Sequence, residues 1–372
     1  MAKRKGPSPI GVDLQQNSAK MIQFCHGPNG PALGACASVS FDDSLIQIED
    51  RQTQPIVAAL RQALGRGDFR GCDAVITLPA KKVDVRTLTL PGAEAELEKM
   101  MKWEAESYLH YDVKDACIDY VKLGDVSAGN EKRSEVLVAA AGRPYLYALL
   151  DLLDRAGLKT QAVDIMPMAL CRLARYLGEH VAESSVSIID IGRTASLTVI
   201  LDKGSLRLTR NIACGGEEFT TRIKSNLDIL PEEAELLKIE YGAGAPKQGS
   251  SFGADHELVT KTEVAGAIHE ILRHQLEEMA AELQKLFRYF STQSKGAQVA
   301  RGYLCGGGSK LKGLPDFLTQ HTGTRMEMLP ALATLFPGKC AKDAPASGGP
   351  DACGPEFAVA AGLALRDSAD DR

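Results

Sequence analysis

Asp190, Gly192 and Thr194 form the pattern Asp-x-Gly-x-Thr, the most chemically informative one in the sequence. Apolar residues dominate the flanking runs 186–189 and 197–201, so we predict a strand, a tight turn and a returning strand. At such a tip a carboxylate can face a cation, while backbone amides and a hydroxyl donate to phosphate oxygens. The pattern therefore predicts a site for metal-bound phosphate. An ordinary hairpin, in which Asp and Gly only favour the turn, is the alternative.

A second candidate hairpin lies near the N-terminus. Asp13 follows an apolar strand that begins at Ile10, and a further strand is predicted over 19–24. Asn17 and Ser18 could donate there to phosphate oxygens, with Asp13 near a metal. A solvated hairpin tip is the alternative. Two such openings about 177 residues apart indicate a coarse internal duplication.

Two glycine-rich segments could also contact a ligand. Gly215-Gly216 precedes a predicted helix, and helix N-termini with glycine entries bind anions readily, although a tight turn explains paired glycines equally well. Gly306-Gly307-Gly308 follows a predicted strand over 300–304. The missing side chains there would let backbone approach a flat ligand.

In the second half of the chain we predict helices over 218–241, about 262–293 and 355–365, and a further one that begins near Leu311. The first carries Glu235 and Lys238. Residues three apart lie on one helix face, so these two side chains could hold a shared ligand.

Length and composition indicate the scaffold that positions these segments. With 372 residues, of which 44% are hydrophobic and 24% charged, the chain suits a two-domain α/β protein. The net charge of −5 argues against a general nucleic-acid binder. No apolar run approaches the roughly 18 residues of a membrane span, so we expect no transmembrane segment. The nine dispersed cysteines indicate reduced, mostly buried thiols and a cytoplasmic location.

The middle of the chain has its own pattern. Over 83–163 we predict a strand, an amphipathic helix, two strands and a second helix, in the order βαββα. A unit of this size can form a small two-layer subdomain. We therefore expect an insertion there.

In this order the segments resemble the actin, Hsp70 and sugar-kinase nucleotide fold. The first phosphate hairpin is 10–24, the second is 186–201, the ribose helix includes 234–242, and the adenosine loop is 302–315. The resemblance implies a two-lobed actin-like α/β fold, that is, a duplicated ribonuclease H-like fold with the inserted βαββα subdomain. The first lobe would be 1–82 and 164–185, the insertion 83–163 and the second lobe 186–372.

Within that superfamily the chain resembles the PilM family of type IV pilus assembly proteins. The resemblance runs from Ile10 to Arg366, and most of the matching residues are not catalytic. They include Lys102-Trp-Glu-Ala-Glu106 in the middle unit, Arg210-Asn-Ile-Ala-Cys-Gly-Gly216, and Ala361-Gly-Leu-Ala-Leu-Arg366.

This resemblance implies a cytoplasmic protein, peripheral to the inner membrane, that binds ATP and Mg²⁺ between its lobes. Asp13 and Asp190 would organise Mg²⁺, and Glu235 with Lys238 would hold the ribose. The remaining implied contacts to the nucleotide come from Asn17, Ser18, Lys20, Gly192, Thr194, Ser196, Gly215, Gly216, Gly306, Gly307 and Gly308. A groove beside the middle subdomain would hold the cytoplasmic N-terminal tail of a PilN-type membrane protein, and other pilus platform proteins are further implied partners.

The first hairpin departs from the family pattern, which usually has Asp-x-Gly-Ser-Ser. This chain has Gln15 where the glycine allows backbone to approach the phosphates. We expect ATP binding with little or no hydrolysis, because no residue stands out that would orient an attacking water. A true kinase or ATPase of the superfamily is one alternative. A type II secretion platform scaffold with weak or lost nucleotide binding is another.

Overall fold

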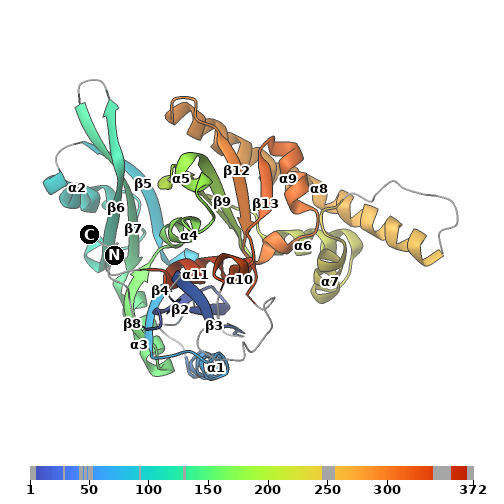
Figure 1. Cartoon of the computed structure of the whole chain (residues 1–372), viewed down its shortest axis with the longest axis horizontal. Coiled ribbons are helices and arrows are strands. Elements are labelled where there is room, and N and C mark those ends of the chain that lie inside the picture. Colours follow the sequence, from blue (N-terminus) through green and yellow to red (C-terminus); the bar gives the residue numbers. More distant parts are fainter. Residues whose placement is uncertain are drawn as a thin grey trace. The chain divides into compact units, whose positions relative to one another are not determined.

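The computed structural model describes residues 6–27, 30–41, 45, 48, 53–91, 94–128, 131–244, 256–337 and 353–366. The chain forms two compact units, drawn with their helices and strands in Figure 1. Unit 1 comprises Met1–Tyr176 and Leu332–Arg372, and unit 2 comprises Leu177–Ala331. Each unit contains a five-stranded sheet, so the expected α/β class is confirmed.

The main sheet of unit 1 has the strand order β3-β2-β1-β4-β8. Neighbours β3, β2 and β1 are antiparallel, whereas β4 is parallel to both β1 and β8. The bounds are β1 Ile10–Leu14, β2 Ser18–Gly27, β3 Gly30–Ser40, β4 Asp73–Thr77 and β8 Lys159–Asp164.

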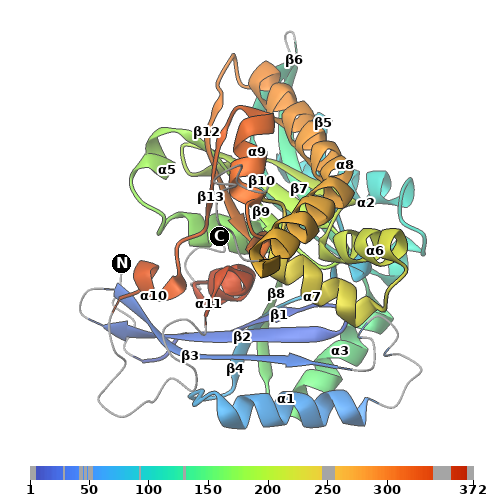
Figure 2. The same cartoon turned by 90° about the vertical axis from the view of Figure 1, so that its right-hand side faces the viewer.

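The two faces of β1 have different neighbours, because successive side chains of a strand point to opposite faces. Ile10, Val12 and Leu14 join a core with α1 (Gln54–Arg66) and α3 (Arg143–Ala156). Gly11 and Asp13 alternate with them, and Gly11 packs against α11 (Ala358–Ala364). Figure 2 shows α1 and α11 on opposite sides of this sheet. Asp13 therefore projects from the α11 side, away from the apolar core of α1 and α3.

The sheet of unit 2 repeats this arrangement, with the order β11-β10-β9-β12-β13. Again the first three strands are antiparallel, and β12 is parallel to both β9 and β13. The bounds are β9 Ser185–Ile191, β10 Ser196–Asp202, β11 Ser205–Ile212, β12 Val299–Cys305 and β13 Arg325–Met328. Because β9 occupies the same place in the order as β1, the topology supports the predicted duplication.

Helices α6, α7, α8 and α9 share one apolar core with this sheet. Their bounds are α6 Gly216–Leu227, α7 Pro231–Tyr241, α8 His256–Gln293 and α9 Leu314–Thr322. The single helix predicted over 218–241 is wrong. Asp228 ends α6 in a left-handed conformation, and Pro231 cannot continue a helix, so α7 begins anew there.

The middle unit contains the elements predicted for it. They are β5 (Asp84–Pro91), α2 (Glu94–Glu106), β6 (Ala116–Ala128), β7 (Glu131–Gly142) and α3. The strands form a separate sheet of order β5-β7-β6, and α2 covers it with Leu97 and Met101. The second predicted helix behaves differently. Leu149 and Leu153 of α3 are buried in the core of the five-stranded sheet.

The end of the chain also differs from the expected division, which placed all of 186–372 in one lobe. Residues 332–372 belong to unit 1, where α11 packs against α4 (Met166–Ala174) and β1. Such a return of the chain leaves no signal in local sequence, because α11 lies about 190 residues after α4 and about 350 after β1 in the chain.

The cysteines also differ in part from the expectation of reduced thiols. Cys36 on β3 and Cys353 form a disulfide, with Cα atoms 6.7 Å apart, and Cys25 is disulfide-bonded as well. Burial raises the pKa of the Cys171 thiol to about 12 and that of Cys214 to about 11. These two thiols are therefore protonated and unreactive at neutral pH.

Candidate functional site

The predicted hairpin at Asp190 is formed by β9 and β10. Asp190 lies one residue before the end of β9 and is 8% exposed. The amide of Gly192 donates to the carbonyl of Ala195 at 3.0 Å, which closes the tip. Arg193 and Thr194 are exposed between them. A buried carboxylate at the base and an exposed hydroxyl and guanidinium at the tip can together meet a metal-bound phosphate.

β12 brings the glycine run beside Asp190. The thiol of Cys305, the last residue of β12, donates to Asp190 Oδ1 at 3.8 Å. Gly306 follows with φ of 82°, and a Cβ there would lie 2.4 Å from the same oxygen. A Cβ on Gly308 would lie 2.4 Å from a side-chain atom of β9, whereas Gly307 has nothing within 4 Å. Only Gly307 therefore presents the open backbone predicted for a flat ligand.

The paired glycines before α6 pack on the hairpin tip. A Cβ on Gly215 would lie 2.5 Å from the carbonyl oxygen of Arg193. The amide of Gly216 donates to the carbonyl of Gly192 at 3.0 Å, and that of Glu217 to the carbonyl of Arg193 at 2.8 Å. Two amides of the first turn of α6 thus hold the tip. The tight turn that the sequence left open is not formed, because Gly215 is extended with φ of −150°, and the anion site stays a prediction.

Ser196 does not have the exposed hydroxyl that was predicted to donate to phosphate. It is fully buried, and its Oγ donates to the carbonyl of Cys214 at 2.6 Å. A hydroxyl has a single hydrogen to donate, so in this conformation Ser196 ties β10 to the segment before α6.

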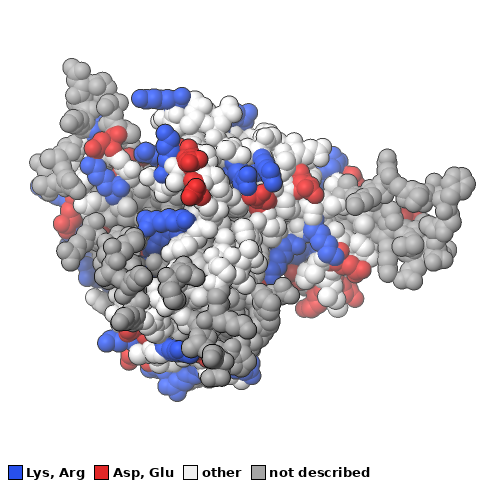
Figure 3. All heavy atoms as spheres, viewed as in Figure 1, with Lys and Arg blue, Asp and Glu red and all other residues white. Residues whose placement is uncertain are grey.

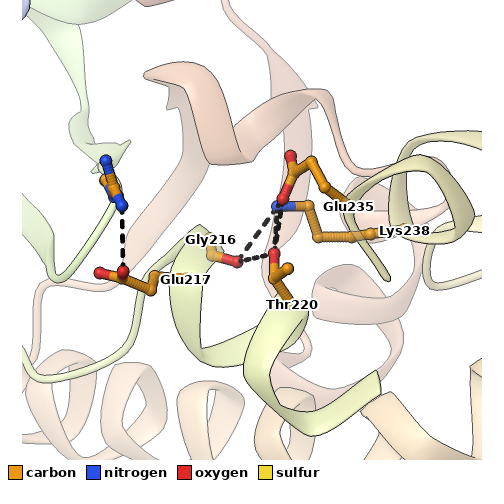
Figure 4. Close-up of polar contacts among 6 residues, drawn as sticks. Gly216, Glu217, Thr220, Glu235 and Lys238 are labelled. Atoms are coloured by element: carbon orange, nitrogen blue, oxygen red, sulfur yellow. Dashed lines mark hydrogen bonds and ion pairs between the residues drawn. The ribbon is translucent and has the colours of Figure 1, made fainter. Parts of the chain in front are cut away.

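The predicted pair Glu235 and Lys238 lies in a hydrogen-bonded group that also includes Thr220 of α6 (Figure 4). Lys238 Nζ lies 2.6 Å from Glu235 Oε2 and donates to Thr220 Oγ1 at 2.9 Å and to the carbonyl of Gly216 at 3.1 Å. Thr220 Oγ1 donates to Glu235 Oε2 at 2.6 Å. Thr220 had no signal in the sequence, because it lies on another helix, 15 residues from its partner.

The Glu235 carboxyl is held in its charged form. Burial by itself raises its pKa, but hydrogen bonds from Lys238 and Thr220, with the charges of Lys238 and Arg193, lower the pKa below its usual range. A carboxylate and an ammonium group at this distance match the hydroxyls of a ribose, which both donate and accept hydrogen bonds.

In unit 1 the carboxylate of Asp13 is 2% exposed and already has two donors. Gln15 Nε2 donates to Asp13 Oδ1 at 2.7 Å, and Thr77 Oγ1 donates to the same oxygen at 3.2 Å. Thr77 in turn accepts from the amide of Leu14 at 3.3 Å. Gln15, predicted to add bulk near the phosphates, therefore caps the carboxylate that was predicted to face a metal.

The other predicted residues of this hairpin surround the same turn. The amide of Gln15 donates to the carbonyl of Ser18 at 2.8 Å, and the carbonyl of Asn17 accepts from Phe41 at 2.8 Å. Lys20 is opposite Asp13 in the β1–β2 ladder. The sequence thus located the turn correctly, and the roles of Asn17, Ser18 and Lys20 towards a ligand remain predictions.

Replacement of Asp13 by asparagine should stabilise the protein at neutral pH. Burial raises the pKa of Asp13 above its ordinary 3.8, against the opposing effects of Lys20, Gln15 and Thr77. A carboxyl whose pKa is higher in the folded state costs stability once it ionises, and this cost disappears as the pH falls towards 3.8. Each unit of pKa shift is worth about 1.4 kcal/mol, which corresponds to roughly 2–4 °C in Tm.

Thermal unfolding from pH 4 to pH 8 checks this prediction. Asp13→Asn should have the higher Tm at pH 7, and the difference should shrink on acidification. Asp154→Asn, at an exposed position of α3, should show no such difference. A lower Tm for Asp13→Asn at pH 7 would mean that the ionised carboxylate stabilises the fold.

The site residues fit a nucleotide better than a metal alone. No group of three or more His, Cys, Asp and Glu in the described ranges could hold a metal ion. Mg²⁺ keeps several waters and is usually bound through one or two carboxylates plus substrate phosphates. Asp190 can supply one such carboxylate, and Thr194, Glu235 and Lys238 supply the polar groups that phosphate and ribose require.

Comparison with known proteins identifies the fold. The chain is similar to PilM in the solved PilM–PilN type IV pilus biogenesis complex, with 26% identity, a TM-score of 0.75 and 98% of each chain covered. It is also similar to the ethanolamine utilization protein EutJ of Carboxydothermus hydrogenoformans, with 14% identity, a TM-score of 0.54 and 96% and 89% coverage. The two-lobed actin-like ATPase fold expected from the sequence is confirmed.

The cell division protein FtsA is a more distant relative. The protein from Streptococcus pneumoniae is 26% identical over 200 residues, which is 52% of this chain and 42% of that protein. The chain thus spans less than half of this relative. FtsA of Enterococcus hirae is 22% identical over 348 residues, 86% of this chain and 77% of that protein. The FtsA family profile matches residues 187–362.

One family profile matches more than half of the chain. It is that of the type IV pilus assembly protein PilM, and it covers residues 11–249. In the part of the chain that the structure describes, no helix combines the length and apolarity needed to cross a bilayer. The profile match, together with similarity over nearly the whole of a solved PilM chain, shows that this protein belongs to the PilM family of type IV pilus assembly proteins.

Proposed function

We propose that this protein is an ATP-binding scaffold of the type IV pilus assembly platform, peripheral to the cytoplasmic side of the inner membrane. We further propose that it binds the cytoplasmic N-terminal tail of a PilN-type membrane protein. The main support is the similarity over 98% of both chains to PilM from a PilM–PilN complex.

In unit 2, nucleotide binding is supported by three groups that the fold brings to the end of β9. Asp190 would approach Mg²⁺, Thr194 would donate to phosphate, and Glu235 with Lys238 would contact the ribose. In unit 1, Asp13, Asn17, Ser18 and Lys20 are the proposed contribution of the first hairpin. Bound ATP supplies four negative charges and Mg²⁺ ligands, and the chain supplies the groups that orient them.

We propose binding without rapid turnover. In-line phosphoryl transfer needs a residue that orients the attacking water, and no residue stood out for that role in the sequence. The carboxylate of Asp13, at the start of the first hairpin, already accepts hydrogen bonds from Gln15 and Thr77. The Gln15 contact specifically favours a second candidate function, a scaffold that has lost nucleotide binding.

For the partner, we propose the surface beside the β5-β7-β6 sheet. Its helix α2 carries Trp103, which is the only tryptophan of the chain and is 71% exposed. Large exposed aromatic side chains are common anchors of protein interfaces. The face shown in Figure 3 offers no continuous basic stripe among its described residues, since Lys and Arg are interspersed with Asp and Glu. The net charge of −5 also argues against a nucleic-acid partner.

One titration series tests the proposal, because Trp103 is a unique fluorophore. The probe is a tryptophan-free synthetic peptide that covers the N-terminal tail of the PilN-type protein from the same organism. We expect saturable binding with a blue shift of the emission, and a peptide affinity that changes when ATP and Mg²⁺ are present, because two linked ligands alter each other's affinity. Calorimetry of ATP alone completes the series.

The outcomes separate the candidate functions. Peptide binding by calorimetry without an emission change would exclude the surface near α2. Peptide binding without any heat from ATP would favour the scaffold that has lost nucleotide binding. No binding of either ligand would overturn the proposal.

A further inference from the structure

Arg193 is the residue at the hairpin tip that no predicted role uses. Its backbone is fixed, because its carbonyl accepts from the amide of Glu217 and the preceding carbonyl of Gly192 accepts from Gly216. Its side chain is 70% exposed, and Nη2 lies 3.1 Å from Oε1 of Glu217 in the first turn of α6. The guanidinium is thus an exposed group on a hydrogen-bonded turn.

The ion pair between Arg193 and Glu217 is easy to break. Both side chains are exposed, with 70% and 47% of their surface accessible, so water screens their attraction. Glu217 also lies at the N-terminus of a helix, where the helix dipole favours a negative charge without help from arginine. A ligand with several negative charges can therefore displace the glutamate from Arg193.

Arg193 also lies among the residues assigned to the nucleotide. Thr194 is its neighbour at the tip, and its positive charge acts on the Glu235 carboxylate strongly enough to contribute to that group's lowered pKa. Figure 4 shows Glu217 on one side of Gly216 and the Glu235–Lys238 group on the other. The charge of Arg193 thus acts on both carboxylates, of which Glu217 is its direct partner at 3.1 Å.

We propose that the guanidinium of Arg193 binds the phosphate chain of a bound nucleoside polyphosphate, and that it pairs with Glu217 when no such ligand is present. The planar guanidinium can donate two parallel hydrogen bonds to phosphate oxygens. Its attraction to the phosphate chain increases with the negative charge of that chain. The inference rests on the proposed nucleotide binding and adds a specificity to it: the number of phosphates determines the affinity.

Calorimetric titration of ATP, ADP and adenosine tests this proposal on three proteins. For Arg193→Gln we expect about a tenfold loss of ATP affinity, typical of a lost charge-assisted hydrogen bond, a smaller loss for ADP and none for adenosine. For Glu217→Gln we expect ATP affinity to rise, by up to about fivefold, because no exposed ion pair has to be broken.

Arg222→Gln is the matched control. Arg222 lies on α6, the helix of Glu217, and forms a similar exposed ion pair with Glu218, at 3.3 Å. Its replacement should leave all three affinities unchanged, and thermal unfolding should show that every variant folds like the wild type.

Failure of the inference differs from failure of the proposed function. Wild-type protein that binds no nucleotide would overturn both. Equal ATP affinities in wild type and Arg193→Gln would overturn the inference alone. Parallel losses for ATP and adenosine in Arg193→Gln would also overturn it, because they would mean that the arginine only supports the shape of the hairpin.

Discussion

Replacement of Arg172 by methionine is expected to destabilise unit 1 by about 3–5 kcal/mol, the usual cost of removing one partner from a buried ion pair. Arg172 of α4 is 7% exposed and pairs with Asp164, whose side chain is 8% exposed at the end of β8. Methionine fills a similar volume but leaves the carboxylate of Asp164 buried. Arg366 still lies 3.2 Å from it, which favours the lower end of the range.

Urea unfolding of a set of variants separates this effect from a general loss of charge. Lys159→Met, at an exposed position of the same strand, should change stability by less than about 0.5 kcal/mol. Asp164→Asn keeps an acceptor for the amide of Ile165, which now donates to Asp164 Oδ1 at 2.7 Å. The loss of unfolding free energy in the double variant, Asp164→Asn with Arg172→Met, should therefore be smaller than the sum of the losses in the two single variants. Equal midpoints for Arg172→Met and Lys159→Met would contradict a role for the pair.

Local patterns in the sequence were sufficient for the main strands. The runs around Asp190 and Asp13 alternate or are fully apolar, and β9, β10, β1 and β2 lie where these runs predicted them. The order βαββα in the middle unit was predicted for the same reason. Strand and turn preferences act within a few residues, so a single sequence carries them.

Contacts between distant segments could not be predicted. Asp164 and Arg366, the disulfide of Cys36 with Cys353, and the return of α11 to β1 each join parts far apart in the chain. Periodicity predicts which face of an element is apolar, and it does not predict which other element covers that face. This is why α3 was expected beside the small sheet and instead lies in the core of the large one.

At the site, the residue types were easier to predict than their partners. Glu235 and Lys238 do lie together, because a spacing of three on one helix determines this. Ser196 follows the exposed tip by two residues, and yet its hydroxyl is buried against the carbonyl of Cys214. Gln15 was recognised as unusual from the family pattern, but only side-chain geometry shows that it donates to Asp13.

Replacement of Gly362 by alanine is expected to have the other large effect, because α11 and α4 touch through their backbones at this glycine. A Cβ on Gly362 would lie 1.9 Å from the carbonyl oxygen of Ala169 and 2.4 Å from its carbonyl carbon. Backbone atoms cannot rotate away as the end of a flexible side chain can, so the helices must separate. Overpacking costs typically 1–3 kcal/mol, and contact with backbone should bring this variant to about 3 kcal/mol or more.

Gly65→Ala provides the matched control, because the same substitution should there have the opposite sign. Gly65 lies in α1, is exposed, and has nothing within 4 Å of the added Cβ. Alanine in an exposed helix is favoured over glycine by roughly 0.5–1 kcal/mol, so this variant should unfold at higher urea concentration than the wild type. Two Gly→Ala variants that shift the midpoint in the same direction would show that α4 and α11 can move apart at little cost, and that their close approach does not limit the stability of unit 1.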